Sequence, residues 1–254
     1  MSNQFFWHEL MTSDTNAAQK FYGDVVGWSA QDAGVGGYPY TIFNASGQGV
    51  GGMLAISPDM AKHGARPGWL GYISVDDVDQ TVSRIKKEGG QVHIELQEVP
   101  GVIRFAMVAD PQGAPFYVAK GLRPDAPPPL PMGTVGTTGW NELMAADWQA
   151  IFAFYEKLFG WTKAEAHDMG PMGIYQLFAA GGPPIGGMMT KPAQIPVAHW
   201  GFYFNVDAID AGTDRITKSG GKILNGPMEV PGGQWVVQAM DPQGAAFNLV
   251  APHR

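Results

Sequence analysis

The chain has 254 residues, of which 45% are hydrophobic and 15% are charged, so it is long enough for one large domain or two smaller ones and has the composition of an ordered globular protein. Its formal net charge is −7 and no run of Lys and Arg exceeds two residues, which argues against nucleic acid or an anionic membrane as a partner. The absence of cysteine excludes disulfides, thiol nucleophiles and cysteine-ligated metal sites. The chain also lacks an apolar run of about 18 residues and the basic, then apolar, start of a signal peptide, so a cytoplasmic location is predicted.

The first half of the chain begins with a predicted strand and a predicted helix. The segment HELMT at 8–12 is typical of a strand, and Asp14 after it belongs to a residue type that caps helices. Apolar residues then recur at helical spacing within 15–28, which predicts a helix with this buried face: Ala17, Phe21, Tyr22 and Val25. The segments YTIFN at 40–44 and GVGGMLAI at 49–56 are predicted to be strands.

The same order of elements then follows a second time. LGYISV at 70–75 is a predicted strand, and Val78, Val82 and Ile85 indicate an amphipathic helix within 76–90 that closes at two glycines. QVHIELQEV at 91–99, IRFAMVA at 103–109 and FYVAK at 116–120 are predicted strands. The first half is therefore predicted to hold two βαβββ modules.

The whole half is then repeated. WHELMTSDTNAAQKFYGDVVGW at 7–28 returns as WNELMAADWQAIFAFYEKLFGW at 140–161, and GVGGML at 49–54 returns as PIGGMM at 184–189. YISVDDVD at 72–79 matches YFNVDAID at 203–210, and DPQGAPFYVA at 110–119 matches DPQGAAFNLVA at 241–251. Between the copies the prolines of RPDAPPPLPMGTVG favour an extended spacer. We therefore predict a first domain at 1–122, a Pro-rich linker at 123–136 and a second domain at 137–254.

In each half, a predicted strand leads into D-x6-FY-x4-GW and is followed by GG[ML], V-D-x-[VI]-D and DP-x-G-x2-F. This order of motifs resembles the vicinal oxygen chelate superfamily. That superfamily includes glyoxalase I, the bleomycin- and fosfomycin-resistance proteins and the extradiol dioxygenases, and the likeness extends over nearly the whole chain, twice. It is closest to two-domain members described as glyoxalase-like or hydroxylase-like. The resemblance implies an α+β fold in which each domain pairs two βαβββ modules into a curled mixed sheet around a cleft.

The positions that hold the metal ion in metal-dependent relatives carry other residue types here. Counting from the family motifs places Trp7 and Trp140 on the first strands and Tyr117 and Asn248 on the last. The remaining two positions in each domain align with Met53 and Met188 and with Leu70 and Gly201. Because divalent ions prefer carboxylate and imidazole ligands, no metal cofactor is predicted, and a divalent metal ion held by other residues is the alternative.

His8 and Glu9 are adjacent, but they do not make a joint site. Side chains alternate along a strand, so Trp7 and Glu9 share one face while His8 lies on the other. His8 is replaced by Asn141 in the second copy, and we expect it to be packed or hydrogen-bonded on the helix side. Glu9 recurs as Glu142, so these two carboxyls are candidates for a catalytic base or, equally, for buried acids satisfied by hydrogen bonds.

Aromatic and amide side chains make up the predicted ligand-binding residues: Trp7, Tyr40, Tyr117, Trp140, Tyr175 and Asn248. They are able to stack on and hydrogen-bond to a flat or hydroxylated ligand, and the alternative is that they fill the core. The copies differ where Arg104 aligns with Trp235 and Met107 with Gln238, so the two clefts need not bind the same compound.

Two functions remain open from the sequence. One is a metal-independent protein of the resistance or detoxification type that binds a small organic molecule in its clefts. The other is a glyoxalase-like or hydroxylase-like enzyme, a lyase, isomerase or oxidoreductase, that uses Glu9 or Glu142 as general base. Either would be a monomer or a homodimer whose partner is a small molecule.

Overall fold

The computed structural model describes residues 3–34, 39–125 and 127–254. Residues 1–2, 35–38 and 126, which belong to the predicted first domain and linker, lie outside the described residues. Each half of the chain forms one eight-stranded mixed sheet with a few helices, which confirms the predicted α+β fold with tandem domains of two βαβββ modules.

The first repeat has the predicted element order with one addition. Its first module contains β1 (Phe5–Thr12), α1 (Thr15–Val26), β2 (Ser29–Asp32), β3 (Thr41–Ala45) and β4 (Gln48–Ala55). A short helix that the sequence did not reveal, α2 (Pro58–Lys62), precedes the second module. That module contains β5 (Gly68–Ser74), α3 (Val78–Lys87), β6 (Gln91–Val99), β7 (Ile103–Ala109) and β8 (Pro115–Gly121).

The second repeat follows the same plan. Its first module contains β9 (Thr138–Ala145), α4 (Trp148–Phe159), β10 (Thr162–Asp168), the 3-10 turn η2 (Gly170–Met172), β11 (Ile174–Ala179) and β12 (Pro184–Thr190). Its second module contains β13 (His199–Asn205), α5 (Ile209–Lys218), β14 (Lys222–Glu229), β15 (Trp235–Met240) and β16 (Ala246–Ala251). Asp14 and Asp147 cap α1 and α4 by accepting backbone N–H groups, which explains why each helix begins where it does.

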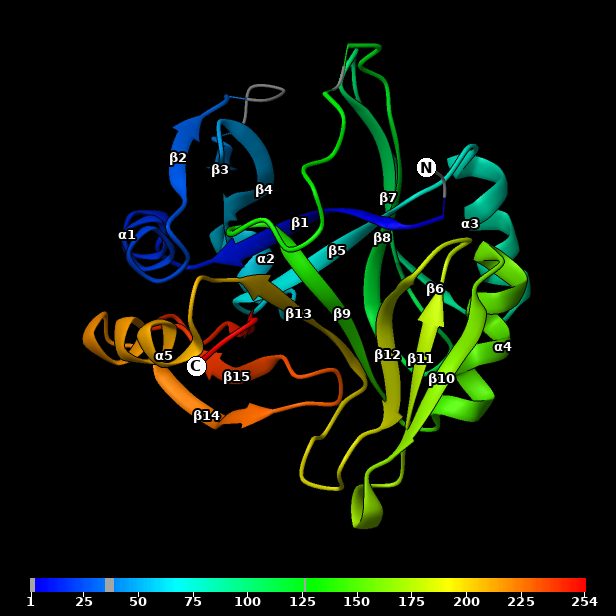
Figure 1. Cartoon of the computed structure of the whole chain (residues 1–254). Coiled ribbons are helices and arrows are strands. Elements are labelled where there is room, and N and C mark those ends of the chain that lie inside the picture. The colour runs from blue at the N-terminus through cyan, green and yellow to red at the C-terminus, as the bar shows by residue number, and fades with distance from the viewer. Residues whose placement is uncertain (1–2, 35–38, 126) are drawn as a thin grey trace. The chain divides into compact units, whose positions relative to one another are not determined.

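The strand orders are β2-β3-β4-β1-β5-β8-β7-β6 and β10-β11-β12-β9-β13-β16-β15-β14. In the first module of each repeat, the first strand pairs in parallel with the fourth strand, and the second, third and fourth strands pair antiparallel to one another. The second modules repeat this pattern, because β5 pairs in parallel with β8 and β13 with β16. Each module thus positions its first and last strands side by side. Figure 1 labels three of these pairs, namely β1 with β4, β5 with β8 and β9 with β12.

The modules group into two compact units that do not follow the sequence repeats. Unit 1 comprises Met1–Phe6, Gly71–Pro127 and Asn141–Trp200, so it joins most of the second module of repeat 1 to most of the first module of repeat 2. Unit 2 comprises Trp7–Leu70, Pro128–Trp140 and Gly201–Arg254. The domain boundaries at 122 and 137 rest on self-similarity of the sequence and stay a prediction.

A buried Tyr–Asp–Trp triad joins the two modules inside unit 2. The Tyr22 hydroxyl on α1 donates to Asp241 Oδ2 at 3.1 Å and accepts from Trp69 Nε1 at 2.9 Å. Asp241 is the aspartate of the second DPQG motif, and its Oδ1 accepts the backbone N–H groups of Gln243 and Ala245. The helix α1 therefore packs on a motif more than two hundred residues away, and α1 also contacts α5.

Unit 1 contains the matching triad. Tyr155 on α4 donates to Asp110 Oδ2 at 2.9 Å and accepts from Trp200 Nε1 at 3.1 Å. Burial raises the pKa of Tyr22 and of Tyr155 well above the ordinary value, and burial also raises the pKa of Asp110 and Asp241. Of the residues predicted to form the buried face of α1, Phe21, Tyr22 and Val25 are buried, whereas Ala17 is half-buried and Ala18 is buried instead. The hydroxyls of Tyr22 and Tyr155 complete polar networks that join residues of both repeats.

Among the residues that the structure describes, no helix is long and apolar enough to cross a membrane.

Candidate functional site

Each module has one face of its sheet covered by its own helix and a second face turned away from that helix, which we call the helix-free face. On β1 the helix side carries His8 and Leu10, whereas Trp7 and Glu9 belong to the helix-free face, as strand alternation predicts. His8 is buried against the ring of Phe202 at 4.6 Å, and its Nδ1 lies 2.9 Å from Thr138 Oγ1. His8 is therefore a packed, hydrogen-bonded residue, as expected.

Trp7, Glu9 and Tyr40 come together on the helix-free face of unit 2. Trp7 Nε1 donates to Tyr40 Oη at 3.0 Å. Glu9 is 4% exposed and pairs in register with Gly52, the second glycine of the GG[ML] motif. A Cβ placed on Gly52 would lie 1.9 Å from Tyr40 Oη, so the tyrosine ring covers this glycine beside the carboxylate. The glycine is required because any side chain would occupy the space of the ring.

The second repeat builds the same arrangement from unit 1 residues. Glu142 is 6% exposed and pairs with Gly187, and a Cβ on Gly187 would lie 2.3 Å from the ring of Tyr175. Trp140, the counterpart of Trp7, belongs to unit 2 and packs against the buried cluster of Tyr203, Val236 and Val250. The structure thus brings Glu9 together with Trp7 and Tyr40, and Glu142 together with Tyr175.

The register corrects one ligand position inferred from the family motif. Met53 pairs with Leu10 and Met188 pairs with Leu143, so both methionines lie on the helix side, where they are buried. The residues on the helix-free face are Gly52 and Gly187 instead. A shift of one residue along a strand moves a side chain to the other face, and the GG[ML] motif does not fix the alignment to within one residue.

The second module of repeat 1 presents an aromatic surface. Tyr72 on β5 pairs with Tyr117 on β8, and their rings stack at 4.2 Å with an interplanar angle of 13°. Phe105 meets Tyr117 edge to face at 5.8 Å, and Met107 pairs with Tyr117 in register. Tyr117 therefore belongs to a group of contacting aromatic rings. Aromatic pairs in general prefer such offset or edge-to-face contacts.

In repeat 2 the equivalent surface is made of amides and a tyrosine. Tyr203 pairs with Asn248, which is buried, and Gln238 pairs with Asn248 from the other side. Gln238 Nε2 donates to Tyr203 Oη at 3.2 Å, while Gln238 Oε1 accepts from Asn225 Nδ2 at 3.3 Å. The difference between Met107 and Gln238 thus lies on the helix-free face and changes its chemistry from apolar to hydrogen-bonding.

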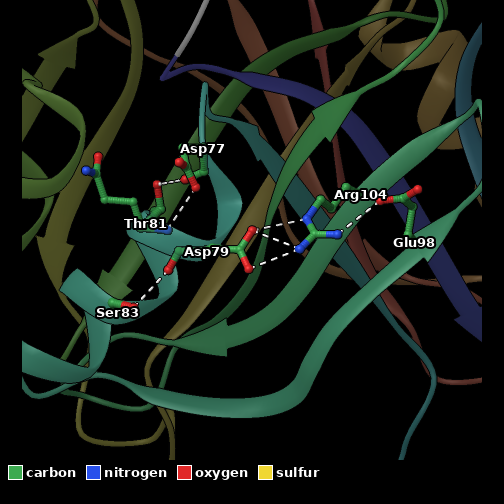
Figure 2. Close-up of polar contacts among 7 residues, drawn as sticks. Asp77, Asp79, Thr81, Ser83, Glu98 and Arg104 are labelled. Carbon is green, nitrogen blue, oxygen red and sulfur yellow. Dashed lines mark hydrogen bonds and ion pairs between the residues drawn. The ribbon is translucent and has the colours of Figure 1, made fainter.

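Arg104 and Trp235 do not belong to that face. Arg104 reaches α3, where its guanidinium donates to both carboxylate oxygens of Asp79 at 2.9–3.1 Å and to Glu98 at 3.0 Å (Figure 2). These bonds raise the pKa of Arg104, the bond to Asp79 most strongly. In repeat 2 the guanidinium of Arg254 lies over the Trp235 ring and bonds to Asp210 on α5. The replacement of Arg104 by Trp235 between the repeats therefore changes the contacts that attach the helix of the second module, α3 or α5, to its sheet.

Sequence reasoning missed Tyr72, Phe105 and Tyr203. Tyr72 and Tyr203 occupy the first position of the repeated motifs YISVDDVD and YFNVDAID, so the repeat itself carried a signal for them. Phe105 has no aromatic counterpart, and only the register of β7 against β8 reveals its place.

Within the described part of the chain, no three His, Asp or Glu side chains gather closely enough to hold a metal ion. A surface hollow of about 400 Å³ lies beside α1 in unit 2, and one of about 220 Å³ lies beside α4 in unit 1. Neither hollow is lined by the predicted ligand-binding residues or by Glu9 and Glu142.

Comparisons with known proteins agree with this fold. The model of the Glyoxalase/Bleomycin resistance protein/Dioxygenase superfamily matches residues 4–118 and again residues 137–249. The chain is 32% identical over 249 residues to the "Putative glyoxylase CFP32" of Mycobacterium tuberculosis, covering 97% of this chain and 94% of the relative. It is 31% identical over 260 residues to the "Anthracycline biosynthesis protein DnrV" of Streptomyces peucetius, covering 96% and 91%.

Two solved structures share the fold at low sequence identity. The Mn(II)-bound glyoxalase from Novosphingobium aromaticivorans superposes with a TM-score of 0.69 at 16% identity and covers 99% of this chain and 82% of that one. A trihydroxybiphenyl dioxygenase from Sphingomonas wittichii gives 0.69 at 13% identity, with coverage of 99% and 91%. Because the family model matches most of the chain and the relatives align along nearly all of it, the protein belongs to the Glyoxalase/Bleomycin resistance protein/Dioxygenase superfamily.

Proposed function

We propose that this protein binds a flat, oxygen-bearing aromatic small molecule on the helix-free faces of its modules, without a divalent metal ion at the family positions. The observation that carries the proposal is the Trp7–Tyr40 hydrogen bond beside Glu9, with the Tyr40 ring over Gly52. Indole and phenol groups are poor ligands for divalent ions, whereas they stack well on aromatic rings. Trp7 thus offers a stacking surface where the resemblance places a metal ligand.

The chemistry of the second modules supports an aromatic ligand that carries oxygen atoms. Tyr72, Phe105 and Tyr117 provide ring contacts in repeat 1, and Gln238 and Asn248 provide amide hydrogen bonds in repeat 2. Small-molecule sites commonly combine such apolar and aromatic walls with a few polar groups. The name of DnrV gives further support, because anthracyclines are built on a flat polycyclic core with hydroxyl and quinone oxygens.

Dihydroxyanthraquinone is a suitable probe, because it has a flat polycyclic core with hydroxyl and carbonyl oxygens. Isothermal titration is expected to show saturable binding to the full chain. Replacing Tyr40 by alanine removes the ring that covers Gly52 and leaves the Trp7 indole without its hydrogen-bond partner, so we expect affinity to fall about tenfold. Tyr175→Ala is expected to act in the same way on the second repeat.

Met132→Ala serves as the control, since Met132 is 78% exposed in the predicted linker. EDTA treatment is expected to leave the affinity unchanged. The proposal is wrong if the untreated protein fails to bind the probe and a wider panel of aromatic compounds, or if binding requires stoichiometric zinc, nickel, iron or manganese.

A second candidate is an enzyme in which Glu9 or Glu142 is the general base. The observation in its favour is that both carboxyls are nearly buried, at 4% and 6% exposure, beside an aromatic ring. The name of the relative CFP32, a putative glyoxylase, points in the same direction. Turnover by the wild-type chain that disappears in Glu9→Gln combined with Glu142→Gln would favour this candidate over binding alone.

A further inference from the structure

We propose that His167 is a specificity-determining residue of the second repeat, where it binds an acidic substituent of the ligand. This inference rests on the proposed function and adds to it a ligand class, namely aromatic compounds that carry a carboxylate. His167 lies on β10, a strand at the edge of its sheet, and it has no part in the triads or in the helix capping described above.

Strand pairing places His167 on the same face as Glu142. Glu142 pairs with Gly187, Gly187 pairs with Leu177, and Tyr175 is two residues before Leu177 and so shares its face. Tyr175 pairs directly with His167 across the β10 and β11 ladder. Directly opposed residues point to the same side of an antiparallel pair, with Cβ atoms roughly 5 Å apart. The imidazole therefore stands beside the ring that covers Gly187.

The imidazole is accessible and has acidic neighbours only at a distance. Its side chain is 24% exposed, and the oxygen of Glu165 on the same strand lies 4.0 Å from His167 Nδ1, beyond hydrogen-bond length. On β11, the strand paired with β10, the titratable group that faces it is Tyr175. Asp168 has the opposite orientation on β10 and accepts from the backbone N–H of Gly170. A ligand carboxylate can thus reach the imidazole.

Among the described residues of the first repeat, no histidine occupies the equivalent position. There β2 ends at Asp32, and the backbone N–H that bonds to the Tyr40 carbonyl at 2.8 Å belongs to Ala33. The described part of β2, Ser29–Asp32, carries no histidine. Two sites that share a glutamate, a glycine and a covering tyrosine therefore differ in one imidazole, which separates their preferences for neutral and acidic ligands.

The test compares dihydroxyanthraquinone with its carboxylated analogue by quenching of tryptophan fluorescence, at about pH 5.5 and about pH 8, the range over which histidine changes charge. Because a protonated imidazole attracts a carboxylate, the affinity ratio of the analogue to the parent compound is expected to be about fivefold higher at the lower pH. In His167→Gln the ratio is expected to be the same at both pH values. His63→Gln, which changes an exposed histidine at the end of α2, is the matched control and is expected to behave as wild type.

The outcomes separate the two proposals. If the parent compound binds but the ratio does not change with pH, or changes equally in His167→Gln, the role of His167 is disproved and the proposed function stands. If neither compound binds at either pH, both proposals fail. A change that is lost in His63→Gln as well as in His167→Gln would also contradict the assignment, because it would reflect the charge of the whole protein.

Discussion

Tyr22→Phe is expected to lower the free energy of unfolding by about 2 to 4 kcal/mol, because it leaves two buried polar groups without a partner. The hydroxyl removed is the acceptor for Trp69 Nε1 and the donor to Asp241 Oδ2, and all three side chains are buried. Phenylalanine keeps the ring contacts with Trp28 and Phe247, so the change isolates the hydroxyl from the packing of the ring. Urea unfolding followed by tryptophan fluorescence measures the loss.

The repeat provides an internal comparison for this variant. Tyr155→Phe removes the equivalent hydroxyl from unit 1 and is expected to cost a similar amount, with the two losses adding in the double variant. Ser83→Ala is the control, since it removes a hydroxyl whose bond to the Asp79 carbonyl is exposed, and little change is expected (Figure 2). Wild-type stability in both tyrosine variants would show that ring packing alone holds the modules together.

Gly52→Ala is expected to displace the Tyr40 ring and to weaken ligand binding about tenfold or more. The added Cβ would lie 1.9 Å from Tyr40 Oη and 2.4 Å from the adjoining ring carbon, distances that no side chain tolerates, so the ring must leave its place and the Trp7 bond must break. Overpacking of this kind costs about 1 to 3 kcal/mol of stability. Gly187→Ala is expected to have the same effect on Tyr175, and titration with dihydroxyanthraquinone measures both.

Two other strand glycines control for the loss of backbone freedom. A Cβ added to Gly68 in unit 2 or to Gly121 in unit 1 would meet no atom within 4 Å, and neither residue has a positive φ, so their alanine variants are expected to bind as wild type. A double variant sharpens the test further. In the Tyr40→Ala background the ring is gone, so adding Gly52→Ala is expected to cost little more, and an additive loss would contradict the covering role of Tyr40.

The sequence was sufficient for the fold because its main signals are local. The N-cap Asp14, the helical spacing of Phe21 and Tyr22 and the alternation in β1 each depend on a few neighbouring residues, and each appears in the structure as predicted. Because the sequence is repeated, two similar segments indicated each main element. Helix α2 escaped prediction because five residues are too short to show an apolar period.

The candidate site depended on strand register, which local patterns do not fix. The motif GG[ML] is evident in the sequence, but aligning Met53 with a metal position puts it on the wrong face, because a shift of one residue reverses every side chain. The stack of Tyr72 on Tyr117 and the pairing of His167 with Tyr175 likewise follow from which strands lie side by side.

The sequence by itself determined the duplication, the order of the modules, the face of β1 that carries Trp7 and Glu9, and the family. Only the tertiary structure decided that Tyr22 bonds to Asp241 and Tyr155 to Asp110, so that the compact units combine modules from different repeats. It also decided that a tyrosine ring covers the second glycine of each GG[ML] motif. The physical reason is that helix caps and strand alternation are set by neighbours in the chain, whereas contacts between distant segments are set by register and by the burial of the whole chain.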